Sequence, residues 1–137
     1  MGWRSVLGLI AGVMVGSLVI MGLEMAGHAL FHVAEDMTSV ETLPLSMQLS
    51  VVGFYAVASF LGGLTAAWVG RTRLPAFATG IVLVALGVWN MAMIPHPGWM
   101  IAANCAALLF PAIIAGYLTL KRASAAQPSV EEKPSQS

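Results

Sequence analysis

Four long apolar runs that carry almost no charge restrict the possible folds of this chain more than any other feature of its sequence. They cover about residues 5–32, 44–70, 76–94 and 99–120. Hydrophobic residues make up 58% of the 137-residue chain and charged residues only 9%, which is more apolar surface than a soluble core of this size can bury. A helix of about 20 apolar residues crosses a bilayer. The sequence therefore predicts an all-α membrane protein, a four-transmembrane-helix bundle formed by residues 1–122.

The ends of the chain need separate interpretation. The first run extends from Ser5 to Leu23, longer than the roughly 7–15 apolar residues of a signal peptide, so we expect it to be retained as a helix. Residues 123–137 are rich in Ser, Pro and Glu, and their composition predicts a short disordered cytoplasmic tail.

Small residues recur at every fourth position in the first two runs. Gly8, Gly12 and Gly16 form one such series, and two neighbouring series in the second run begin at Ser59 and Gly62. Small residues at this spacing allow two membrane helices to approach closely. We therefore expect the first two helices to be the closest pair, with homo-oligomerisation through the same faces as an alternative use.

Basic residues predict the orientation in the membrane. Five of them fall on one side of a four-span arrangement, whereas the loops on the other side contain none; they are Arg4, Arg71, Arg73, Lys121 and Arg122. Because loops rich in Lys and Arg stay in the cytoplasm, both termini are expected inside. The same distribution leaves no basic stripe for nucleic acid, which is not an expected partner.

Polar residues collect at the predicted outer end of the bundle. Glu24, His28, His32 and Asp36 follow one another at four-residue spacing, so neighbouring members share a helix face. His96, Asn90 and Asn104 are expected at a similar depth on other helices. Imidazoles at positions i and i+4, with a carboxylate nearby, can bind a divalent transition metal, so Glu24, His28, His32 and His96 are the candidate ligands.

Two interpretations of this polar cluster remain open. The residues either mark the end of a membrane span or form a site, and an ionisable group within a span, as Glu24 is, favours a functional role. The Glu-His pattern lacks the HExxH spacing of zinc hydrolases, and a lone histidine outside the first helix argues against bis-histidine haem. The single cysteine, Cys105, excludes an intramolecular disulfide.

The motifs Leu23-Glu24 with Gly27-His28, and Pro95-His96-Pro97 followed by Trp99, resemble those of a group of small, uncharacterised four-transmembrane-helix proteins of bacterial inner membranes. The resemblance implies a multi-pass inner-membrane protein and supplies no activity. We therefore expect a non-enzymatic accessory or interaction protein whose partners are the lipid bilayer and a second membrane protein or copy. The alternatives are a metal-binding or proton-coupled transport protein using the Glu/His cluster, and a membrane enzyme acting on lipid or quinone.

Overall fold

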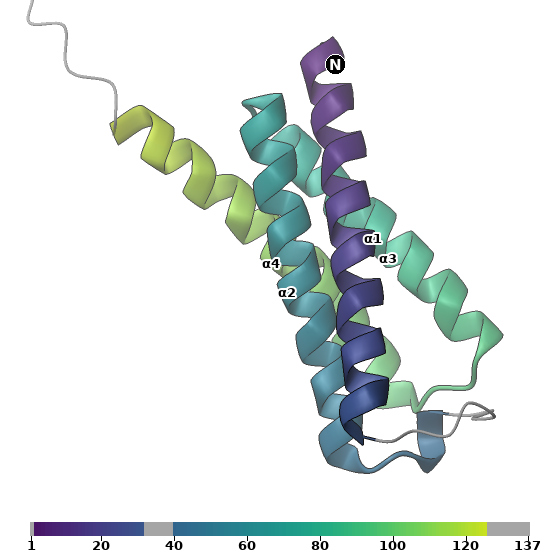
Figure 1. Cartoon of the computed structure of the whole chain (residues 1–137). Helices are drawn as coiled ribbons and strands as arrows, with labels where there is room; N and C mark the ends of the chain where they lie inside the picture. Colours follow the sequence, from purple (N-terminus) through teal and green to yellow (C-terminus); the bar gives the residue numbers. More distant parts are fainter. Residues whose placement is uncertain (1, 32–39, 126–137) are drawn as a thin grey trace, which may run out of the picture.

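The computed structural model describes residues 2–31 and 40–125, and these residues form an all-helical bundle (Figure 1). Its elements in chain order are α1 (Trp3–Phe31), the short 3-10 helix η1 (Val40–Thr42), α2 (Leu45–Gly70), α3 (Leu74–Met93) and α4 (Gly98–Ala125). All four α-helices are long and apolar enough to cross a membrane. The prediction of four helices that are long and apolar enough to span a membrane is therefore confirmed.

Two boundaries fall near parts that the structure does not describe. Helix α4 continues to Ala125, three residues into the segment that the sequence assigned to a tail, and residues 126–137 lie outside the described part. The loop between α1 and η1, which carries His32 and Asp36, also lies outside it.

The contact between α1 and α2 is the most extensive of any helix pair among the described residues, as the glycine spacing predicted. A Cβ atom built on Gly8 would lie 2.6 Å from the carbonyl oxygen of Ala66, and one on Gly12 would lie 2.7 Å from that of Gly62. Only glycine leaves room for the two backbones to approach this closely. The glycine face of α1 is thus used within the chain.

The second small-residue face of α2 packs against α4. The hydroxyl of Ser59 donates a hydrogen bond to the carbonyl oxygen of Leu108. One helical turn further along α2, Gly63 lies against Ala112, where an added Cβ would come within 2.6 Å of the Ala112 Cα. Helix α2 therefore presents small residues to two neighbours and lies between α1 and α4.

Side-chain size is distributed in the way that lipid as a solvent requires. Small side chains fill much of the interior, and among the fully buried ones are Ala58, Ser59, Ala66, Ala67, Ala76, Thr79, Ala112 and Ala115. Large apolar side chains such as Ile10, Met14 and Leu18 instead cover the outside of α1. A soluble bundle would bury these large side chains, whereas lipid solvates them without cost.

The up-and-down course of the helices gathers opposite charges at opposite ends of the bundle. At one end, the guanidinium of Arg73 lies 4.2 Å above the ring of Tyr117, so the start of α3 meets the last part of α4. Arg4 and Arg71 also lie at this end, which we call the basic end. The other end carries η1 and Glu24 and is called the η1 end. The predicted gathering of basic residues at one end is confirmed for the described residues.

Candidate functional site

The site at the η1 end is organised around one hydrogen bond between two helices. Tyr55 of α2 donates its hydroxyl proton to Oε1 of Glu24 in α1, with 3.1 Å between the oxygens. Tyr55 is almost fully buried, and Glu24 is half-buried. A buried tyrosine needs a partner for its hydroxyl, and a carboxylate inside an apolar bundle needs a donor, so each group satisfies the other.

Tyr55 reaches Glu24 because of local sequence on both helices. Gly27, one turn after Glu24, leaves the space that the ring of Phe54 occupies, since an added Cβ would approach this ring to 3.0 Å. The ring of Tyr55 packs against Leu83 and Leu108, which hold it in place. The phenol hydroxyl therefore points toward α1 while the ring stays packed in the core.

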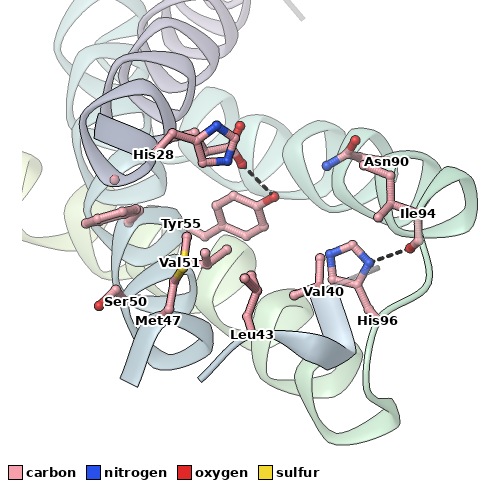
Figure 2. A pocket seen from close by; sticks show the side chains of 13 residues that line it. His28, Val40, Leu43, Met47, Ser50, Val51, Tyr55, Asn90, Ile94 and His96 are labelled. Atoms are coloured by element: carbon pink, nitrogen blue, oxygen red, sulfur yellow. Dashed lines mark hydrogen bonds between the residues drawn. The ribbon is translucent and has the colours of Figure 1, made fainter. Parts of the chain in front are cut away.

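A pocket with a volume of about 380 Å³ opens beside this hydrogen bond (Figure 2). His28 of α1, Ser50 of α2, Asn90 of α3 and His96 of the α3–α4 turn line it together with Glu24 and Tyr55. Apolar side chains complete the wall, namely Val40, Leu43, Met47, Val51, Phe54 and Ile94. A largely apolar cavity with a few convergent polar groups is the usual form of a small-ligand site.

Helix η1 closes one side of the pocket and is itself fixed by hydrogen bonds. The Val40 amide donates to the carbonyl oxygen of Pro95 at 3.1 Å, which ties η1 to the α3–α4 turn. The side-chain amide of Gln48 donates to the carbonyl oxygens of Leu43 at 2.9 Å and Val40 at 3.3 Å. The pocket wall is thus preorganised rather than formed by a loose loop.

His96 is held in one orientation by the backbone next to it. Its Nδ1 lies 2.6 Å from the carbonyl oxygen of Ile94, and because a carbonyl only accepts, Nδ1 carries the proton. In the neutral ring, Nε2 is then an acceptor or a metal ligand. Figure 2 shows this second nitrogen on the side of the ring away from Ile94.

The chemistry of the pocket favours a ligand that donates hydrogen bonds. Glu24 is the carboxylate among its lining residues, and no Lys or Arg of the described part lines it. Tyr55 engages one oxygen of Glu24, and within the described residues no further hydrogen bond to this carboxylate is found. The second oxygen can therefore accept from a group that enters the pocket.

A second, smaller pocket adjoins the first and runs along the α1–α3 boundary. Glu24, Tyr55 and Asn90 line both cavities. Residues from the central parts of the helices complete the second one, including Ser17, Leu83 and Leu86. The three polar residues thus lie between an opening at the η1 end and a cavity that extends toward the middle of the membrane span.

The structure brings together four of the seven polar residues predicted from the sequence. Glu24, His28, Asn90 and His96 line the same pocket. Asn104 is buried elsewhere, with its side-chain nitrogen 3.6 Å from the sulfur of Met91. His32 and Asp36 lie outside the described residues.

The described residues do not provide a complete set of ligands for the predicted metal site. Within residues 2–31 and 40–125, no group of three His, Cys, Asp or Glu side chains lies close enough to hold a metal ion. His32, one of the four candidate ligands, is among the residues not described. The metal site therefore stays a prediction.

Tyr55 is the site residue that sequence reasoning missed. Its signal was available, because a tyrosine within an apolar run needs a hydrogen-bond partner, and Glu24 is a carboxylate in another such run.

Comparison with protein-family models, curated proteins and solved structures gives no match, so the function must be inferred from the site itself.

Proposed function

We propose that this chain is a non-enzymatic accessory or interaction protein of a membrane, and that it binds its partner through the η1-end pocket. The observation that carries the proposal is the convergence of Glu24, Tyr55 and Asn90, from three helices, on one cavity. Side chains that only marked the end of a span would be expected to point separately into water. A hydrogen bond that spans two helices instead supports a built site.

The partner is a molecule or protein segment with a hydrogen-bond donor or a positive charge. Glu24 and the imidazole of His96 offer acceptors, and no Lys or Arg among the described residues lines the pocket to receive an anion. The glycine face of α1 is filled by α2, which leaves the pocket rather than this face for the partner.

The same proposal includes a location. We place the chain in a bacterial inner membrane, with the basic end in the cytoplasm and the pocket on the outer side. The basic residues at one end support this orientation through the positive-inside rule.

Site-specific photocrosslinking in native membranes tests the proposal. A photoreactive phenylalanine at Ser50 faces the pocket, whereas the same residue at Leu49 faces outward from the adjacent position. We expect a discrete adduct from position 50 that Glu24→Gln weakens strongly, and only diffuse lipid products from position 49. Identical products from the two positions would contradict the proposal.

Metal or proton coupling is the second candidate, because Glu24, His28 and His96 line one pocket. These three side chains do not by themselves lie close enough to hold an ion, so the metal version depends on His32, which lies outside the described residues. It predicts that Zn²⁺ raises the melting temperature of the purified protein and that His28→Ala removes the increase. Equal melting curves with and without Zn²⁺ would exclude the metal version.

A further inference from the structure

A third cavity lies at the basic end, and its chemistry is opposite to that of the η1-end pocket. It has a volume of about 680 Å³ and lies among the start of α1 and the ends of α2 and α4. Two arginines and two tryptophans line it above an apolar floor: Arg4, Arg71, Trp3, Trp68, Leu7 and Leu120. Nothing in the proposed function uses this cavity.

The two guanidinium groups in this cavity lack a carboxylate partner in the described part of the chain. Arg4 lies over the ring of Trp3, with 5.8 Å from its central carbon to the ring centroid. Glu24, the carboxylate placed by the η1-end pocket, and Glu41 of η1 are both at the far end of the bundle. Both arginines are also exposed, so their positive charge is available to a ligand.

The backbone at Arg71 has a conformation that suits glycine better than arginine. Arg71 follows the last residue of α2 with φ 54, in the left-handed region, where glycine is the usual residue. An arginine at this position is less favourable for the fold than glycine. Glycine can therefore replace Arg71 without harm to the turn, so Arg71→Gly removes the charge alone.

The apolar walls of the cavity identify the kind of anion. Trp3 and Trp68 are 70% and 74% exposed, and indole rings exposed in this way at the end of a span occupy the membrane interface. Leu7, on the same cavity, is exposed on the lipid-facing side of α1. The arginines match the anionic headgroup of a phospholipid, and the apolar surface matches its acyl chains.

We propose that this cavity binds an anionic phospholipid, with Arg4 and Arg71 on its phosphate and the tryptophans beside its glycerol and acyl groups. Basic pockets between membrane helices bind acidic headgroups in this way, and each Lys or Arg near a headgroup contributes about fivefold in affinity. The lipid anchors the basic end, so that the η1-end pocket lies at a constant depth. The lipid site rests on residues separate from the η1-end pocket, and either proposal can fail without the other.

Native mass spectrometry of the full chain, released from a neutral detergent, tests the lipid site. Phosphatidylglycerol and phosphatidylcholine with the same acyl chains are titrated separately, and bound lipid is counted. The wild-type protein should retain phosphatidylglycerol in preference to phosphatidylcholine. Equal retention of the two lipids would overturn the proposal, and so would displacement of phosphatidylglycerol by millimolar inorganic phosphate, because the site would then recognise a free anion.

Variants separate a lipid site from general charge and from misfolding. Arg4→Gln and Arg71→Gly should each weaken phosphatidylglycerol binding about fivefold, and the double variant about 25-fold. Arg71→Gly also removes the unfavourable left-handed arginine, so its loss of lipid cannot be explained by a damaged turn. Lys121→Gln is the matched control, because Lys121 is an exposed cation near the end of α4 that does not line the cavity. A loss in Lys121→Gln as large as in the double variant would contradict a specific site.

Discussion

Replacing Gly12 by alanine tests the packing that fixes the whole bundle. An added Cβ at this position would lie 2.6 Å from the Cβ of Ala66, and 2.7 Å from both the carbonyl oxygen of Gly62 and the hydroxyl of Thr79. Ordinary van der Waals contact begins near 3.4 Å, so the atoms would overlap by up to about 0.8 Å. The nearest neighbours are a backbone carbonyl and an alanine Cβ, which cannot rotate away.

Because α1 and α2 must separate to admit this methyl group, Gly12→Ala should lower the free energy of unfolding by about 1–3 kcal/mol. The measurement is unfolding in mixed micelles with increasing sodium dodecyl sulfate, followed by helix content or by tryptophan fluorescence. Gly22→Ala is the matched control in the same helix, since no atom lies within 4 Å of its Cβ position. The control should be neutral or up to about 1 kcal/mol more stable. If Gly12→Ala were as stable as wild type, or Gly22→Ala equally damaging, the close α1–α2 packing described here would be wrong.

Three further predictions concern buried polar groups. Ser59→Ala removes the hydrogen bond to the Leu108 carbonyl and should destabilise the bundle by about 0.6–1.7 kcal/mol in the same unfolding assay, whereas Thr65→Ala, which loses only an exposed bond within its own helix, should change little. Asn104→Leu should be neutral or stabilising, because Oδ1 of Asn104 is buried without a hydrogen-bond partner in the described residues; a loss above about 1 kcal/mol would contradict this. Gln48→Leu should release η1 and accelerate hydrogen exchange at the Val40 amide, and unchanged exchange would show that Gln48 does not fix η1.

The sequence was sufficient for the helices and for part of their packing. Charge and length located the four spans, and the four-residue spacing of Gly8, Gly12 and Gly16 identified the face of α1 that meets α2. These inferences succeed because lipid excludes charge and because close helix contact requires small residues.

The rotation of α3 and α4 was much harder to predict. In a soluble helix the apolar face shows which side is inward, but in a membrane both sides are apolar and this signal is absent. Asn104 illustrates the difficulty: its depth was predictable, yet its direction toward Met91 rather than toward the pocket depends on how α4 rotates. Tyr55 was missed for a related reason, since its pairing with Glu24, 31 residues away in the sequence, depends on the register between α1 and α2.

The most direct test of the proposed site is a double-mutant cycle on Glu24 and Tyr55. Unfolding free energies are measured in mixed micelles for wild type, Glu24→Leu, Tyr55→Phe and the double variant. A hydrogen bond between the two side chains predicts a coupling energy of about 0.6–1.7 kcal/mol, so the double variant should lose less than the two single losses combined. Strictly additive losses would mean that Glu24 and Tyr55 do not interact, which would contradict the hydrogen bond on which the proposed site depends.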